Sequence, residues 1–407
     1  MQTQSTDQAQ SLSGASALGT AILLGSLSFG ILQFALPIYA KGLGASALDV
    51  GGIVSAFALV ITLARPLVGW GLDHMGRKPF LASSFLFYAF AMLLFGLSRD
   101  LRLLLVARLV QGLGSALLWI PAYTVATELT SRDWGKSVGG IDMASARGGL
   151  LGTFVGFPLL FIADKFTLGW RWMFEAYAVA ALIAGVLIWR AVPETRPARA
   201  QPDSTQRKDV QGFDRKLLSR LMLIVFLTGT SSSMISPLLM IFLQDRFSTD
   251  FRVLATAYLP AALVYAFLPG RLGGLSDRFG RAPLMAIGLI GAAFVSVWMP
   301  STPSLVVLAA LWVVESVGYS AATPAEEAFV ADLAGESVRG TGYGLYMFAA
   351  GLGFTVGPVL GGWLYDAAGH AVPFYINGAV LCLGAGLVLR LLMQQRGGAP
   401  MPQKQAH

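Results

Sequence analysis

Four ionisable residues lie inside long apolar stretches of the sequence, where a charge is hard to solvate. Glu315 follows residues 282–314, a run that contains no Asp, Glu, Lys or Arg. Arg108, Asp142 and Arg147 also have mostly apolar neighbours. An ionised carboxylate is costly in such a place, so Glu315 is expected to take up a proton or to pair with an arginine. Arg147 is suited to an anionic group of a ligand or to a carboxylate on another helix.

The composition shows what surrounds these residues. Of the 407 residues, 55% are hydrophobic and only 13% are charged, and the mean hydropathy is +0.65. A soluble globular chain has about 25% charged residues, so a soluble enzyme is excluded. The 25 Phe, 11 Tyr and 9 Trp also exclude a disordered chain. An integral membrane protein is the class that remains, and each ionisable residue in a span becomes a candidate functional residue.

Apolar runs of about 20 residues, the length of one membrane-spanning helix, predict an all-α membrane protein with twelve transmembrane helices. The runs are apolar all round and lack the alternation of a membrane barrel. The predicted spans are 18–39, 49–71, 80–98, 102–126, 138–162, 171–190, 219–243, 253–274, 284–300, 304–328, 341–364 and 373–393. They predict two six-helix bundles, 18–190 and 219–393, a polar cytoplasmic linker at 191–218, and cytoplasmic tails at 1–17 and 394–407.

The distribution of Lys and Arg between the loops predicts the orientation. With the N-terminus inside, the cytoplasmic loops, linker and tail hold eighteen Lys and Arg residues and the opposite side holds seven. Basic residues are enriched on the cytoplasmic side of membrane proteins, so both termini are expected in the cytoplasm. The first 17 residues contain no Lys or Arg and therefore do not resemble a cleaved signal peptide.

A loop pattern recurs in the two halves. Gly69, Asp73, Gly76, Arg77 and Pro79 follow the second predicted span, and the same residue types recur 204 positions later as Gly273, Asp277, Gly280, Arg281 and Pro283. Both copies lie on the same side of the membrane. The chain is therefore predicted to be a parallel repeat of two six-helix units, an arrangement that places a binding site near the middle of the membrane between the repeats.

With these motifs the chain resembles a major facilitator superfamily transporter over 18–393. The loop pattern is similar to the family motif G-x-L-a-D-r-x-G-r-k, Arg108-x-x-Gln111-Gly112 is similar to R-x-x-q-G, and Pro193-Glu194-Thr195 is similar to P-E-T/S. The drug-proton antiporters of the family carry G-x-x-x-G-P-x-x-G-G in their fifth span. Here the full pattern is in the eleventh span, from Gly353 to Gly362, and the fifth span has only Gly148, Gly149, Gly152, Gly156 and Pro158.

The resemblance assigns further roles. It implies proton coupling for Arg108, and Glu315 and Asp142 are the carboxylates predicted to take part. In this fold the first and fourth helices of each unit contribute strongly to the cavity wall. The predicted substrate-binding residues are Gln33, Phe34, Trp119, Tyr123, Arg147, Met234, Trp312 and Tyr319, with Phe29 as a further wall candidate. The loop motifs predict a cytoplasmic gate of Asp73, Arg77, Glu128, Asp277 and Arg281, in which Arg77 pairs with Asp73 or with Glu128.

The predicted function is proton-coupled export of small amphiphilic or drug-like molecules, without enzymatic activity, across a bacterial inner membrane. An importer or facilitator of a small polar metabolite is the alternative, and an intramembrane enzyme is less favoured. No P-loop motif is present, and the three His residues form no metal-binding pattern, so neither a cofactor nor a metal is expected. The expected partners are a small-molecule substrate, protons and membrane lipid. Nucleic acid is not expected, and the protein is expected to be a monomer.

Overall fold

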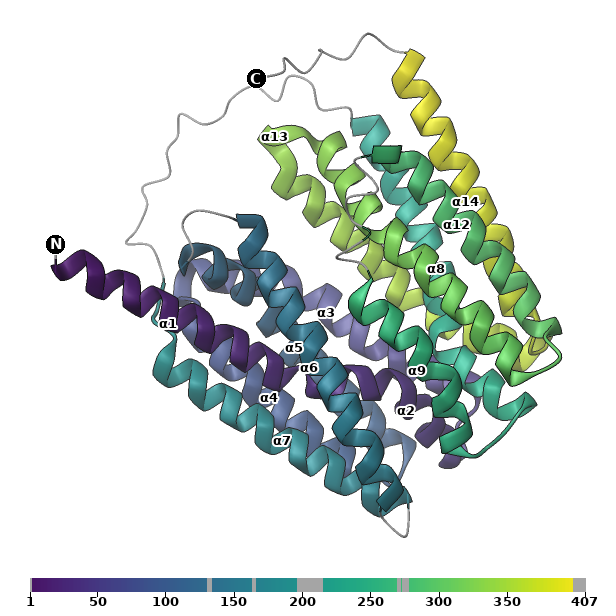
Figure 1. The fold of residues 1–407 in the computed structure, drawn as a ribbon, viewed down its shortest axis with the longest axis horizontal. Coiled ribbons are helices and arrows are strands. Elements are labelled where there is room, and N and C mark those ends of the chain that lie inside the picture. The colour runs from purple at the N-terminus through teal and green to yellow at the C-terminus, as the bar shows by residue number, and fades with distance from the viewer. Residues whose placement is uncertain are drawn as a thin grey trace. The chain divides into compact units, whose positions relative to one another are not determined.

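The computed structural model describes residues 2–129, 134–162, 166–195, 215–268, 272 and 278–397. These residues form helices and no strand (Figure 1). The chain divides into two compact units, Met1–Ser204 and Thr205–His407. Asp277, most of the predicted linker and the residues from 398 onward lie outside the described residues.

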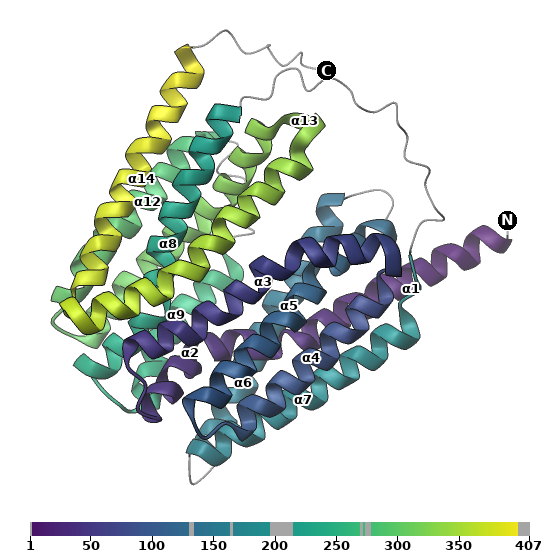
Figure 2. The ribbon, with the colours of Figure 1, turned by 180° about the vertical axis from the view of Figure 1, so that it is seen from behind.

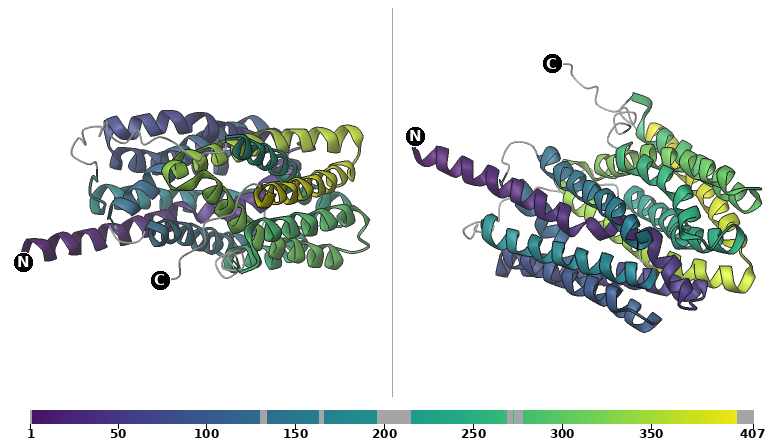
Figure 3. Two further views of the ribbon diagram at one scale, coloured as in Figure 1. Left: turned by 90° about the horizontal axis from the view of Figure 1, so that it is seen from above. Right: turned by 60° about the horizontal axis from the view of Figure 1, so that its bottom comes forward.

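Each unit is a bundle of long helices (Figures 2 and 3). The N-terminal unit contains α1 (Gln2–Gly25), α2 (Leu27–Gly42), α3 (Ala47–Met75), α4 (Lys78–Leu97), α5 (Leu101–Leu129), α6 (Trp134–Ile162) and α7 (Phe166–Ala191). The C-terminal unit contains α8 (Arg215–Arg246), α9 (Phe251–Phe267), α12 (Arg281–Trp298), the short 3-10 helix η1 (Met299–Ser301), α13 (Leu305–Ala368) and α14 (Val372–Gly397). In the N-terminal unit α4 packs against α5 and α7, and in the C-terminal unit α12 packs against α13 and α14.

The helices match the twelve predicted spans. Within the described residues, ten segments are long and apolar enough to cross a membrane. The fifth and eighth spans are the exceptions, for different reasons. Helix α6 is 29 residues long but contains Lys136, Asp142 and Arg147, and the described part of the eighth span, α9, is an apolar helix of 17 residues. The all-helical fold with two six-span units is therefore confirmed.

The first span is two helices rather than one. Helix α1 ends at Gly25 and α2 begins at Leu27, with Ser26 between them. The Ser26 hydroxyl donates a hydrogen bond to the Ser145 hydroxyl of α6, over 3.1 Å. Helix α1 also begins at Gln2, within the predicted tail 1–17, where no proline interrupts the chain.

Helix α13 carries two spans, Leu305–Val330 and Tyr343–Ala368. Both spans touch the middle of α8, because Ser232 hydrogen-bonds to Tyr319 and the neighbouring Ser233 donates to the Gly353 carbonyl. A straight helix would separate Tyr319 from Gly353 by about 50 Å. The chain therefore reverses direction between Val330 and Tyr343, as the α13 ribbon does in Figure 1, and we refer below to the first and second legs of α13.

Within each unit, a glycine allows two helices to come into close contact. A Cβ atom at Gly152 of α6 would lie 1.7 Å from the Leu27 carbonyl oxygen of α2. A Cβ atom at Gly357, in the second leg of α13, would lie 2.2 Å from the Thr230 carbonyl oxygen of α8. Such backbone contact requires glycine. In the N-terminal unit the fifth span (α6) thus approaches the first (α2) closely. In the C-terminal unit the eleventh span (second leg of α13) approaches the seventh (α8) in the same manner.

Candidate functional site

A charged cluster joins the α3–α4 loop to the ends of α5 and α7. The Arg77 guanidinium forms an ion pair with Glu128, with Nη2 3.1 Å from Oε1, and donates to the Leu72 carbonyl over 3.0 Å. The other Glu128 oxygen accepts a hydrogen bond from the Thr195 hydroxyl. Arg77 is only 9% exposed, so water screens this pair less than a surface pair. Of the two partners predicted for Arg77, Glu128 is therefore bound.

Glu194, just beyond α7, binds the start of α4. Its carboxylate accepts hydrogen bonds from the backbone N–H groups of Arg77, over 2.8 Å, and Lys78, over 3.1 Å. A helix N-terminus has unpaired N–H groups and a partial positive charge, which an anion stabilises. Gly76 permits this contact, because its φ is +90° and a Cβ atom there would lie 2.7 Å from Glu194 Oε2. The P-E-T motif is therefore part of the loop cluster.

The second copy of the loop has a related contact. Arg281, at the start of α12, donates a hydrogen bond to the Ala328 carbonyl near the end of the first leg of α13. Arg77 also reaches the end of the fourth span, but its partner there is the Glu128 carboxylate and not a carbonyl. The side chain of Asp73 and the whole of Asp277 lie outside the described residues, so their predicted gate roles stay predictions.

Arg108 is buried in α5 and held by aromatic rings. It is 8% exposed, and its Nη1 donates to Gln111 Oε1 over 2.8 Å. The guanidinium carbon lies 5.4 Å from the Phe57 ring centre and 5.9 Å from that of Phe95. Its Nε has no hydrogen-bond partner among the residues that the structure describes. The structure thus shows no carboxylate bound to Arg108 in the described part of the chain.

Tyr123 and Asp142, predicted separately, meet between α5 and α6. The Tyr123 hydroxyl donates to Asp142 Oδ1 over 2.6 Å. Trp119 stacks on Tyr123 with ring centres 5.9 Å apart, and Phe29 lies 6.1 Å from Trp119. All three rings are half-buried. They form an aromatic row along α5 and α2 that ends at an exposed carboxylate.

Glu315 is half-buried in the first leg of α13. Tyr265 of α9 and Tyr319, one turn further along α13, lie close enough to interact with it electrostatically. The Tyr319 hydroxyl is hydrogen-bonded to the Ser232 hydroxyl of α8. Among the described residues, Glu315 forms no ion pair or hydrogen bond. An ionised carboxylate at this position in a span would therefore lack a counter-charge.

Two predicted wall residues belong to the packed interior of their units instead. Phe34 is fully buried and packs edge-on against Phe157 of α6, with ring centres 5.3 Å apart. Met234 is 1% exposed and packs against the Gly361 backbone of α13. We therefore remove both from the candidate wall. Gln33 and Arg147 are exposed, and Trp312 is half-buried with its ring 5.7 Å from that of Tyr258.

A buried polar chain in the C-terminal unit has no counterpart in the sequence prediction. The Ser231 hydroxyl of α8 donates to Asn377 Oδ1 of α14 over 2.7 Å. Asn377 Nδ2 donates to the Ser296 hydroxyl of α12 over 3.0 Å, and that hydroxyl donates to the Phe374 carbonyl. The three polar side chains are at most 4% exposed. The chain ties three helices together where no water would satisfy these groups.

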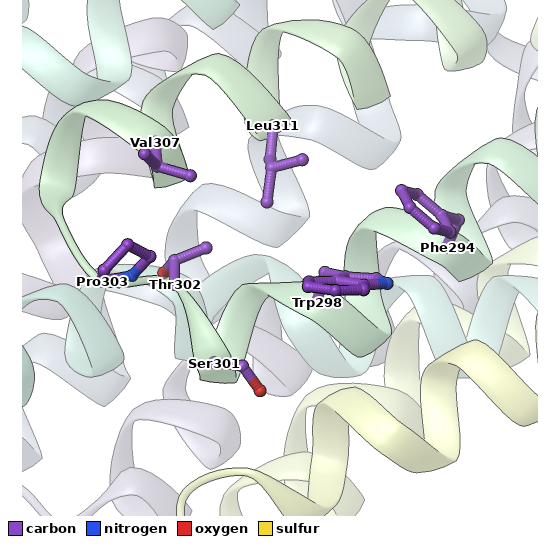
Figure 4. Close-up of a pocket in the computed structure, with 7 residues that line it drawn as sticks. All are labelled: Phe294, Trp298, Ser301, Thr302, Pro303, Val307 and Leu311. Carbon is purple, nitrogen blue, oxygen red and sulfur yellow. The ribbon is translucent and has the colours of Figure 1, made fainter.

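One pocket lies between α12 and the first leg of α13 (Figure 4). Its volume is about 250 Å³. The lining residues are Phe294, Trp298, Ser301, Thr302, Pro303, Val307 and Leu311. None of them is charged or belongs to the predicted site, so we do not assign the substrate to this pocket. The described residues also contain no group of His, Cys, Asp and Glu side chains arranged to hold a metal ion.

Comparison with known proteins identifies the family. The family model described as Major Facilitator Superfamily matches residues 18–268 and again residues 221–406. The chain belongs to the Major Facilitator Superfamily. It is an integral membrane transporter, in agreement with its apolar spans.

Curated relatives match most of the chain. Multidrug resistance protein 1 of Bacillus subtilis strain 168 is 24% identical over 377 residues, which cover 91% of this chain and 94% of the relative. Multidrug resistance protein 2 of the same organism is 25% identical over 381 residues, covering 90% and 92%. Among solved structures, a bacterial homologue of the human lysosomal transporter Spinster has a TM-score of 0.77 at 16% identity, covering 97% of this chain and 99% of that one. The last similarity concerns the fold alone.

Proposed function

We propose that this transporter exports small amphiphilic molecules and is driven by proton entry. The observation that carries the proposal is Glu315, a carboxylate within a membrane-spanning segment that has no ion pair among the described residues. Such a group is stable when protonated and costly when ionised, which makes it suited to carry a proton. The multidrug resistance proteins among the relatives support export of amphiphilic compounds.

Each unit has its own part in the proposal. In the C-terminal unit Glu315 takes up the proton, and Tyr319 and Trp312 line the substrate path beside it. In the N-terminal unit Trp119, Tyr123 and Phe29 offer aromatic faces, which favour an amphiphilic cation. Asp142, bonded to Tyr123, supplies a negative charge at the end of that row. Arg108 supports coupling from within the bundle, and Gln33 and Arg147 complete the proposed wall.

The charged loops act as the gate. We place both termini and the α3–α4 loop in the cytoplasm, from the excess of basic residues on that side. Arg77, Glu128 and Glu194 hold the cytoplasmic ends of α4, α5 and α7 together while the gate is closed. Arg281 does the same for α12 and α13, and Asp73 and Asp277 belong to the same loops.

Inside-out membrane vesicles test the direction and the coupling together. Their lumen corresponds to the cell exterior, so an exporter should accumulate a fluorescent amphiphilic cation such as ethidium when the lumen is made acidic. Glu315→Gln should abolish this accumulation, because the amide cannot carry the proton. Glu175→Gln, in an exposed ion pair on α7, is the matched control and should leave accumulation unchanged. Accumulation by Glu315→Gln at the normal rate would refute the proposal, and loss of the probe from an acidic lumen would indicate import.

A further inference from the structure

A second carboxylate lies on the same face of α13 as Glu315. Glu326 is eleven residues further along the first leg. Eleven residues correspond to just over three whole turns, so the two side chains differ in direction by only about 20°. Tyr319 lies between them along the helix, at about 40° from Glu315. The axial separation of the two carboxylates is about 16 Å. Glu315 is near the middle of the Leu305–Val330 span and Glu326 is near its end.

The surroundings of Glu326 also link it to Glu315. Its side chain is half-buried. Tyr319 interacts electrostatically with both carboxylates. The other neighbours of the Glu326 carboxylate in the described residues are Glu327, a like charge, and Tyr346 of the second leg of α13, whose hydroxyl lies within hydrogen-bonding reach of it. No ion pair joins Glu326 to α8, α9 or α14 in the described residues.

The nearest basic group from α12 is otherwise engaged. Arg281 reaches the first leg of α13 two residues beyond Glu326, where its guanidinium donates to the Ala328 carbonyl. No ion pair holds Glu326 within the described residues. A carboxylate fixed for structure would be expected to have a cation or several donors around it. Glu326 instead has a single donor, the Tyr346 hydroxyl, and like Glu315 it has no counter-charge among the described residues.

We propose that Glu326 is a second proton-carrying residue, which receives the proton from Glu315 on its way to the cytoplasmic side. This inference rests on the proposed function. The proton leaves the Glu315 carboxylic acid, passes the Tyr319 hydroxyl and intervening water, and ends on the Glu326 carboxylate. Glu315 is then ionised and Glu326 neutral, so one proton moves and no other bond changes. The distance excludes direct transfer, which is why a hydroxyl and water on the same helix face are needed.

The test uses the whole protein in inside-out vesicles, with two measurements. The first is ethidium accumulation driven by an acidic lumen, over a range of external pH. The second is exchange of ethidium across the membrane without a pH gradient, which needs the moving transporter but no net proton transfer. Glu326→Gln should slow the first about tenfold or more and leave the second at the wild-type rate. Glu326→Asp should restore accumulation with a changed pH profile.

Glu327→Gln is the matched control. Glu327 is the adjacent residue, is exposed, and points about 100° away from Glu326 around the helix. Vesicles with the Glu327→Gln protein should accumulate ethidium at the wild-type rate. Normal accumulation by Glu326→Gln, with Glu315→Gln inactive, would overturn the inference and leave the proposed function intact. Normal accumulation by both variants would overturn the proposed function as well. Loss of exchange together with accumulation in Glu326→Gln, with no recovery in Glu326→Asp, would show a structural role and also overturn the inference.

Discussion

Removal of the Glu194 carboxylate should destabilise the N-terminal unit measurably, although the residue is near the surface. Glu194→Ala removes the acceptor of two backbone N–H groups at the start of α4. Loss of a helix-capping side chain costs about 1 kcal/mol. Loss of a negative charge at a helix N-terminus costs about a further 0.5 kcal/mol when the charge is exposed. The expected decrease in the free energy of unfolding is therefore about 1.5 kcal/mol, and Glu194→Gln should cost less because its amide keeps one acceptor oxygen.

Thermal unfolding of the purified protein in detergent measures this effect. For a domain of about 200 residues, 1.5 kcal/mol corresponds to a decrease of about 3–6 °C in the unfolding midpoint. Glu175→Ala is the matched control, because Glu175 pairs only with Arg171 on the exposed face of α7. That pair contributes about 0.5 kcal/mol or less. The control midpoint should therefore decrease by no more than about 2 °C.

Two results would contradict this reasoning. If Glu194→Ala and Glu175→Ala lower the midpoint equally, the bonds to the Arg77 and Lys78 N–H groups contribute no more than an exposed ion pair. If Glu194→Gln is as unstable as Glu194→Ala, the remaining acceptor oxygen has no effect and the hydrogen bonds are not the cause.

Two further variants test the packing of the N-terminal unit by the same measurement. Gly152→Ala should lower the free energy of unfolding by about 1–3 kcal/mol, since the new Cβ atom would overlap the α2 backbone. Gly139→Ala, in an open part of the same helix, should raise it by about 0.5–1 kcal/mol. If both substitutions changed the free energy of unfolding in the same direction, the contact at Gly152 would be refuted. Arg108→Lys should lower the free energy of unfolding by about 1–2 kcal/mol, because an ammonium cannot stack on two aromatic rings as the guanidinium does. The control Arg171→Lys, at an exposed position, should have almost no effect. An Arg108→Lys protein as stable as the wild type would show that the rings do not stabilise the charge.

The sequence predicts the helices well because membrane spans depend on local properties. A run of about 20 apolar residues must become a helix in lipid, whatever surrounds it. The duplication is also visible in the sequence, since the loop around Asp73 and its copy around Asp277 have identical residues at five positions with one offset. The break at Ser26 is not predictable in this way, because the first span is continuously apolar and the break accompanies a contact with Ser145 on another helix.

The site residues are harder to predict because their roles depend on which face of a helix meets which neighbour. Phe34 and Met234 lie in the right spans for a cavity wall, but both turn into the packed interior of their units. A wall and a core are equally apolar, so residue type does not separate them. Asn377 is the opposite case, a residue that the sequence did not single out. A single Asn in the last span gave no reason to expect a buried hydrogen-bond network that connects α8, α12 and α14.

The glycine motif shows how a departure in sequence can leave the geometry unchanged. The fifth span lacks the full G-x-x-x-G-P-x-x-G-G pattern, and the eleventh span has it. Gly152 of α6 nevertheless meets the α2 backbone as closely as Gly357 of α13 meets that of α8. Close approach of two helices needs a missing side chain at the contact rather than a complete motif. The close contact between the fifth and first spans is therefore present although the pattern in the fifth span is incomplete.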